Sequence, residues 1–76
     1  MHAHDQTERA HYTIHVRSVM DIDWATWFCE FTVTHDAAGT TVLSGEVADR
    51  AGFYELMRRV RDLGLMVVAV ERREQS

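Results

Sequence analysis

The sequence predicts an α+β fold, a ferredoxin-like βαββαβ two-layer sandwich with a short first helix. Three observations favour this class: stretches in which apolar and polar residues alternate, one long segment with helical spacing of apolar residues, and a final run that is apolar throughout. Right-handed crossovers would give the strand order 4-1-3-2, with both helices on one face of the sheet. If the short helix does not cross over, the alternative is a βββαβ meander with one helix.

The first strand is predicted in the stretch HYTIHVRSV. Tyr12, Ile14 and Val16 fall on one face of a strand, because successive side chains point to opposite faces. The polar residues between them would face solvent. This pattern is typical of a strand that is buried on one side only.

The stretch DIDWATWFCEF contains an aromatic cluster whose role needs an explanation. Three aromatic residues have the i, i+3, i+4 spacing of one helical face: Trp24, Trp27 and Phe28. We expect a short helix at residues 22–29, with Asp21 or Asp23 as its N-cap. The three rings would form a structural plug over one end of the sheet, with Trp27 in the core. A ligand cage is the alternative for the same residues.

Two further strands form a predicted antiparallel hairpin. The stretches FTVTH and TTVLSGEV flank the turn DAAG, in which Gly39 can adopt a positive φ. The face of the sheet away from the helices, here called the open face, would then be polar and rich in threonine. The residues expected on it are Thr13, His15, Arg17, Thr32, Thr34, Val42 and Ser44.

The clearest predicted element is a helix from residue 50 to residue 63. Asp49 is its expected N-cap, and Gly64 follows it at the C′ position. Its apolar residues recur at intervals of three and four: Phe53, Leu56, Met57, Val60 and Leu63. The stretch LMVVAVE follows as a last strand that is apolar on both faces.

The domain organisation is predicted as a single α+β domain. Residues 11–73 form it, residues 1–10 are a disordered tail, and residues 74–76 are a frayed end. Cys29 is the only cysteine, so no internal disulfide can form, which fits a reducing compartment. No secretory signal is visible, and the longest apolar run, LMVVAV, is too short to span a membrane. We therefore expect a cytoplasmic protein that does not bind membranes.

Charge argues against nucleic acid as a partner. The formal net charge is −4, which is unfavourable for binding phosphate backbones. RNA-recognition domains with this topology stack bases on aromatic side chains of the sheet, and no Phe, Tyr or Trp is expected on the open face. The cluster of Arg58, Arg59 and Arg61 is interpreted as a solvated helix face that acidic neighbours partly neutralise.

No motif indicates a catalytic, cofactor or metal site. The sequence lacks a phosphate-binding loop, an HExxH motif and a CxxC pair. His11 and His15 would lie about 13 Å apart on a strand, too far to share one metal ion. Enzymatic activity stays open, and we favour a non-enzymatic interaction or accessory module without cofactor or metal. The alternative is a small-molecule-binding regulatory domain of the ACT-like kind, which has the same topology and length.

Self-association is the partnership that the sequence predicts. Only one set of alternating side chains in the last strand can face the helices, so the other set would leave an exposed apolar edge. The interface candidates are Leu65, Val67 and Ala69, with Val42 on the open face, and if the alternation is reversed, Met66, Val68 and Val70. A symmetric homodimer is expected, with an unidentified protein as the second option for a partner.

The sequence also resembles a family of small, uncharacterised bacterial proteins with the pattern W-x2-WF, then G-T-T-x-L-x-G-x-V-x-D, then R-D-L-G-L-x-V-x-x-V. The residues that carry the resemblance are Trp24, Trp27, Phe28, Gly39, Thr40, Thr41, Leu43, Gly45, Val47, Asp49, Arg61, Asp62, Leu63, Gly64, Leu65, Val67 and Val70. The likeness covers residues 12–72. The chain departs from the family where Arg50, Phe53 and Glu55 replace Gln, Leu and Gly. The resemblance implies the fold and adds no mechanism.

Overall fold

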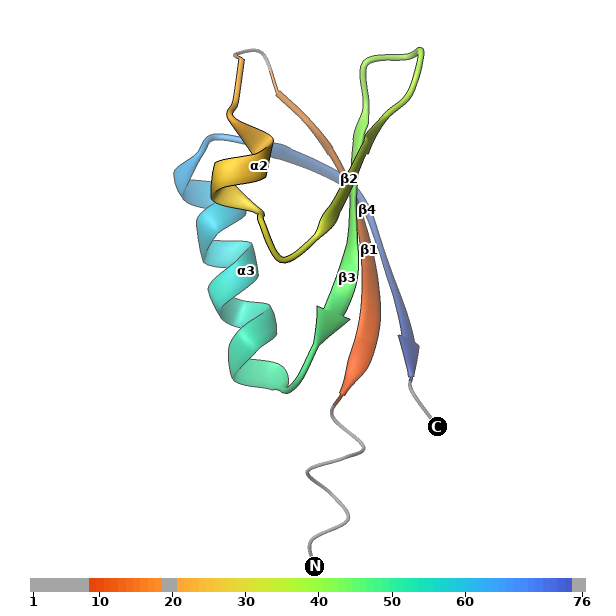
Figure 1. Cartoon of the computed structure of the whole chain (residues 1–76), viewed down its shortest axis with the longest axis vertical. Helices are drawn as coiled ribbons and strands as arrows, with labels where there is room; N and C mark the ends of the chain where they lie inside the picture. Colours follow the sequence, from red (N-terminus) through yellow and green to blue (C-terminus); the bar gives the residue numbers. More distant parts are fainter. Residues whose placement is uncertain (1–8, 19–20, 75–76) are drawn as a thin grey trace, which may run out of the picture.

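The computed structural model describes residues 9–18 and 21–74 and shows a small α+β fold. One sheet of four antiparallel strands is covered by two helices that lie on the same face (Figure 1). The elements are β1 (Ala10–Arg17), α2 (Trp24–Trp27), β2 (Thr32–His35), β3 (Thr41–Val47), α3 (Arg50–Asp62) and β4 (Met66–Glu74). None of the described helices combines the length and the apolar character that crossing a membrane requires.

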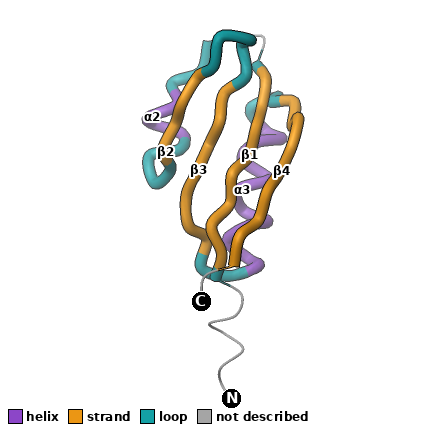
Figure 2. The backbone as a smooth tube through the Cα atoms, turned by 90° about the vertical axis from the view of Figure 1, so that its right-hand side faces the viewer, coloured by secondary structure: helices purple, strands orange, loops and turns teal. Residues whose placement is uncertain are grey.

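The strand order of the sheet is β2-β3-β1-β4, and each neighbouring pair is antiparallel. Read from the opposite edge, the same order is β4-β1-β3-β2. β3 and β1 therefore lie in the middle, and β2 and β4 form the two edges (Figure 2). α3 lies behind β1 and β4, whereas α2 lies beside β2 (Figure 2).

β1 divides its side chains between the two faces of the sheet, as its alternating pattern predicts. Its buried residues are Ala10, Tyr12, Ile14 and Val16. Residues that lie opposite each other in an antiparallel pair share a face, so the register identifies the open face. The open face carries the predicted residues Thr13, His15, Arg17, Thr32, Thr34, Val42 and Ser44, together with His11, Glu46, Met66, Ala69, Glu71 and Arg73. None of these is Phe, Tyr or Trp.

α3 forms most of the second layer. Asp49 is its N-cap, and the carboxylate accepts a hydrogen bond from the Gly52 N–H at 2.8 Å. Gly64 follows the helix with φ +74°, a left-handed conformation that glycine adopts without steric cost. The helix buries Leu56 and Val60 against the sheet. Both helix ends agree with the prediction.

The turn between β2 and β3 is held by Asp36. Its carboxylate accepts from the backbone N–H groups of Ala38 at 2.9 Å and Thr40 at 3.0 Å. The Asp36 N–H in turn donates to the Thr40 carbonyl at 2.9 Å. Gly39 has φ +88°. The predicted hairpin is therefore confirmed, and its turn is fixed by an aspartate side chain as well as by glycine.

α2 is a single turn, shorter than the helix predicted at residues 22–29. Asp23 is its N-cap, and the carboxylate also accepts from the Thr26 hydroxyl at 2.7 Å. The helix ends at Trp27, and Phe28 has left helical geometry with φ −132° and ψ 47°.

Two of the three aromatic residues around α2 pack against the core, and the third does not. Phe28 is fully buried and Trp24 is partly buried, but Trp27 is 48 % exposed. The expected core position of Trp27 was therefore wrong. The reason is the early end of the helix, because the i, i+3, i+4 spacing defines one face only while the chain stays helical. The rings of Trp24 and Phe28 stack with centroids 5.9 Å apart.

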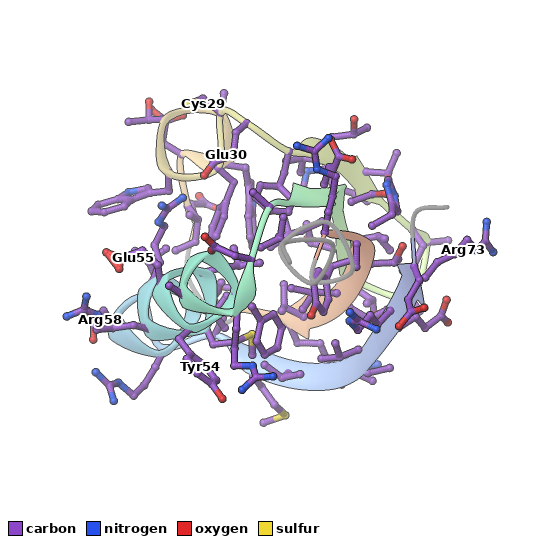
Figure 3. All side chains as sticks on the ribbon, turned by 90° about the horizontal axis from the view of Figure 1, so that it is seen from below. Cys29, Glu30, Tyr54, Glu55, Arg58 and Arg73 are labelled. Atoms are coloured by element: carbon purple, nitrogen blue, oxygen red, sulfur yellow. The ribbon has the colours of Figure 1, made fainter. Side chains whose placement is uncertain are left out.

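Arg59 links α3 to the α2 segment through hydrogen bonds. Its guanidinium donates to the Trp27 carbonyl at 2.8 Å and to the Glu30 carboxylate at 3.1 Å. The same group lies 5.7 Å from the centroid of the Phe28 ring. Figure 3 shows Glu30 between the α2 turn and α3, whereas Arg58 lies on the outer side of α3. The interpretation of Arg59 as part of a solvated face was therefore wrong.

The sheet extends beyond the predicted domain limits at both ends. β1 begins at Ala10, which was assigned to the N-terminal tail but is fully buried. Ala10 lies between Val47 on one side and Glu74 on the other, and Glu74 was assigned to the frayed end. Of the predicted tails, residues 1–8 and 75–76 lie outside the described residues.

Candidate self-association edge on β4

β4 is an edge strand of nine residues, all of them exposed. Six large hydrophobic side chains are exposed in the described part of the chain, and four of them belong to β4. These are Met66 at 66 %, Val67 at 39 %, Val68 at 55 % and Val70 at 41 %. The first five residues, 66–70, form an apolar edge without a protecting charge, and such an edge favours pairing with another chain.

A β-bulge at Val68 determines which side chains of β4 lie on each face of the sheet. His15 lies opposite Ala69, but Val16 lies opposite Val67, so the pairing with β1 skips Val68. One extra residue therefore stands on the β4 side, and the alternation of side chains is interrupted there. The predicted division of this strand into two strictly alternating sets fails at this position.

The bulge brings residues from both predicted sets onto each face. Val67 and Val70 lie opposite buried residues of β1 and therefore face the helices. Met66 and Ala69 lie opposite polar residues of β1 and therefore lie on the open face. The apolar character of the edge is thus shared by both faces, and burial of the whole edge requires a partner beside it rather than on one face.

Of the four leading interface candidates, the structure brings only Val67 and Ala69 to this edge. Leu65 is 8 % exposed and belongs to the core, and its N–H donates to the Val60 carbonyl at 3.1 Å. Val42 lies on β3, which β1 separates from β4. The sequence signal for this site was the unbroken apolar run itself. No residue type in that run marks the bulge, because valine fits either face equally well.

The backbone of β4 leaves a row of hydrogen-bonding groups at the free edge. In an antiparallel ladder, pairs that exchange hydrogen bonds alternate with pairs that do not. The bond from the Asp36 N–H to the Thr40 carbonyl fixes this alternation for β2 and β3. The strand registers extend the same alternation of hydrogen-bonded and non-bonded pairs from β3 through β1 to β4. The N–H and C=O groups of Val70, Arg72 and Glu74 then point away from β1.

The charged half of β4 is partly neutralised within the chain. Arg72 pairs with Glu74 at 3.0 Å and donates to the Tyr12 hydroxyl at 3.2 Å. Hydrogen bonds to Glu74 and Tyr12 raise the pKa of the Arg72 guanidinium above its ordinary value. Glu71 lies 4.0 Å from His15. The part of β4 before Glu71 carries no charge, so like-charge repulsion does not oppose its pairing with a second strand.

The groups of a metal centre do not converge in the described part of the chain. Across residues 9–18 and 21–74, no three His, Cys, Asp or Glu side chains are placed to hold a metal ion. His15 lies on the open face, whereas His35 lies on the helix-facing side of β2, so these two side chains cannot act together.

Comparison with known proteins identifies a family for this chain. A family model described as a domain of unknown function (DUF8691) matches residues 11–71. No curated protein and no solved structure is significantly similar to the chain. The comparisons therefore supply neither an activity nor a ligand.

Proposed function

Because the chain belongs to the DUF8691 family, a domain of unknown function, we propose a function from its surface: a non-enzymatic interaction module that forms a homodimer through β4. The observation that supports this proposal is the exposed apolar part of the edge strand β4, from Met66 to Val70. Burying apolar surface is favourable by about 25 cal/mol per Å². A second copy brings the same edge, so one contact covers both.

The proposed dimer pairs two antiparallel β4 strands across a twofold axis. Every second residue of β4 points its backbone N–H and C=O groups toward the free edge. Any two of these residues are an even number of positions apart, so the twofold axis that relates them passes through a residue rather than between two residues. An axis at Glu71 or Arg72 would set like charges opposite each other, which is destabilising. An axis at Val70 would set the apolar Val68 opposite a charged arginine, whereas an axis at Ala69 sets Val68 opposite Val70 of the partner subunit, apolar against apolar. We therefore place the axis at Ala69.

Light scattering behind size exclusion tests the dimer. At tens of micromolar, the wild type should give about twice the chain mass of 8.8 kDa. Val68→Lys should give the monomer mass, because a charge on an edge strand opposes pairing. Val68 is 55 % exposed, so the change leaves the core intact.

Val42→Lys is the matched control for this experiment. It introduces the same charge on the open face, two strands from the edge, and the dimer should persist. A wild type with the monomer mass contradicts the proposal. A dimer that Val42→Lys dissociates and Val68→Lys does not would mean that the open faces associate instead.

A cysteine crosslink tests the position of the axis. In a Cys29→Ser background, Ala69→Cys should form an intermolecular disulfide, because the two Cα atoms would lie about 4.5 Å apart. Val67→Cys, two residues along the same strand, should not. Non-reducing electrophoresis distinguishes the two variants, and crosslinking of Val67→Cys alone would contradict an axis at Ala69.

We also propose that the fold is the ferredoxin-like sandwich. The strand order read from β4 is 4-1-3-2, neighbouring strands are antiparallel, and both helices lie on one face. The exposed, unpaired Cys29 supports a reducing, cytoplasmic location. The family pattern in the sequence supports a bacterial source.

A further inference from the structure

The edge opposite β4 carries a groove between α2 and β2. Its volume is about 540 Å³. The side chains that line it include Trp24, Phe28, Cys29, Phe31, Val33 and His35. The Trp24 ring lies 5.9 Å from the ring of Phe28 and 5.9 Å from that of His35. The groove is thus mostly apolar and aromatic.

The walls of this groove are fixed by contacts to other parts of the fold. A Cβ atom on Gly45 would lie 2.7 Å from the Phe31 ring, so the ring occupies space that only glycine leaves open. On the other wall, Asp23 caps α2 and Arg59 holds the carbonyl of Trp27. The groove therefore exists before any ligand binds.

The free backbone edge of β2 runs along the groove. Because Asp36 and Thr40 form a hydrogen-bonded pair, every second residue before Asp36 also bonds to β3. The backbone groups of Thr32 and Thr34 therefore point to β3, and those of Val33 and His35 point outward. Within residues 9–18 and 21–74, these outward groups make no backbone hydrogen bond. The side chains of Val33 and His35 line the groove. An added strand would meet backbone donors, backbone acceptors and an apolar surface together.

The surroundings of the groove are acidic. The charge of Arg59 at one wall is balanced by Glu30, with which it is paired at 3.1 Å. Asp23 directly precedes Trp24, Asp36 directly follows His35, and both aspartates are exposed. The charge at this edge is therefore complementary to a basic partner and unfavourable for an acidic one.

We propose that the β2 edge binds an extended segment of a partner protein with apolar side chains at alternate positions and Arg or Lys at its ends. Strand addition pairs its backbone with Val33 and His35, and its alternate side chains enter the groove. Because β2 has four residues, the paired segment is short, and the flanking charges add affinity. A second copy is not the occupant. Pairing its β4 with β2 is head-to-tail and does not close into a dimer, and pairing β2 with β2 would bring two acidic edges together.

A peptide titration tests this proposal. The probe is the acetylated, amidated peptide Arg-Val-Thr-Val-Arg, added to a Trp27→Phe variant in which Trp24 is the remaining tryptophan. A saturable change in Trp24 fluorescence is expected. The peptide with Glu at both ends should have an affinity at least about tenfold lower. The peptide that is N-methylated at both valines should lose binding, because the valine N–H groups would donate to β2.

Two arginine substitutions separate the groove from general charge effects. Ala25 is exposed and lines the groove, whereas Thr34 is exposed on the open face of the same edge. Ala25→Arg should weaken binding about tenfold or more, and Thr34→Arg about threefold or less. Equal losses in both variants, no saturable change at all, or undiminished binding of either altered peptide would overturn the proposal.

The same titration in the Val68→Lys variant separates this proposal from the dimer. Because β2 and β4 are opposite edges of the sheet, peptide binding should be unchanged whether or not the chain dimerises. Loss of peptide binding in Val68→Lys would place the peptide on β4 and overturn the assignment to β2.

Discussion

At the scale of single residues, Phe28 and Arg59 stabilise a helix that is too short to be stable alone. A one-turn helix has almost no intrinsic stability in water, because nucleation costs more than its few hydrogen bonds return. Phe28 supplies a fully buried ring. Arg59 satisfies the last carbonyl of the turn, at Trp27, and pairs with Glu30. Both contacts come from outside the helix itself.

Substitution of the two neighbouring aromatic residues should give different losses of stability. Phe28→Ala should lower the free energy of unfolding by about 3–5 kcal/mol, because it leaves a cavity in the core. Trp27→Ala should lower it by less than about 1 kcal/mol, because Trp27 is 48 % exposed. Urea unfolding measures both values. Equal losses would show that Trp27 belongs to the core.

Glu30 makes the contact between α2 and α3 dependent on pH. Burial alone would raise the pKa of this carboxyl, but a backbone hydrogen bond and the Arg59 guanidinium hold it below its ordinary value. A carboxyl whose pKa is lower in the folded state stabilises the fold above its unfolded pKa. That contribution is lost as the pH falls through the folded pKa.

Glu30→Gln should remove this part of the pH dependence. The wild type should be more stable than the variant at neutral pH, and the difference should shrink as the pH falls through the lowered pKa of Glu30. Thermal unfolding across this range gives the comparison. Glu55→Gln, which removes an exposed ion pair with Arg58 on the outer side of α3, is the control. A constant difference between wild type and Glu30→Gln at every pH would contradict the role of ionisation.

At the scale of elements, the two edge strands differ in what they leave exposed. β4 exposes apolar side chains on both faces and a long free backbone. β2 exposes a short backbone beside an aromatic groove. The bulge in β4 mixes its two alternating sets of apolar side chains, since an unbroken ladder would have kept each set on one face.

Deletion of Val68 should leave the fold intact. The pairing of β4 with β1 already skips this residue, so its removal gives an unbroken ladder with every other pair unchanged. We expect the free energy of unfolding to change by no more than about 1 kcal/mol. Circular dichroism and urea unfolding measure the result.

Deletion of Ser44 is the matched control. β3 pairs with both neighbours without a bulge, so one missing residue turns the following side chains to the wrong face. This variant should not fold. If deletion of Val68 also abolished folding, the bulge would be required rather than merely accommodated.

At the scale of the whole molecule, charge is divided between the two ends of the chain. Residues 1–49 contain eight acidic residues and two arginines, a net charge of −6, and residues 50–76 contain six arginines and four acidic residues, a net charge of +2. Cys29 beside the groove and Arg73 on β4 lie on different sides of the molecule (Figure 3). If light scattering showed species larger than a dimer, the acidic and basic edges of different copies would be attracting each other. That result would contradict both proposals.

The whole chain should not bind DNA or RNA at about 150 mM salt. The net charge is −4, and the described open face carries no Phe, Tyr or Trp on which bases could stack. Fluorescence anisotropy with labelled single-stranded and duplex oligonucleotides measures this. Micromolar binding would require a surface that neither the charge nor the sheet accounts for.

The sequence by itself determined the elements and the buried face of most of them. The alternation of Tyr12, Ile14 and Val16 indicates the buried side of β1, because the period of two is a local property. Asp49 and Gly64 likewise mark the ends of α3 through local backbone chemistry. The unbroken apolar run of β4 likewise indicates the candidate edge, because the helices can cover only one face of the sheet.

Only the tertiary structure decided the bulge at Val68, the burial of Phe28 in place of Trp27, and the contact made by Arg59. Each depends on segments that are distant along the chain. Arg59 bonds to the carbonyl of Trp27 across 32 positions, and Val68 is skipped by the register between β1 and β4. The local spacing of apolar residues contains no information on the register between strands or on the position of a neighbouring helix. From the sequence alone, Val68 and Arg59 are therefore indistinguishable from ordinary surface residues.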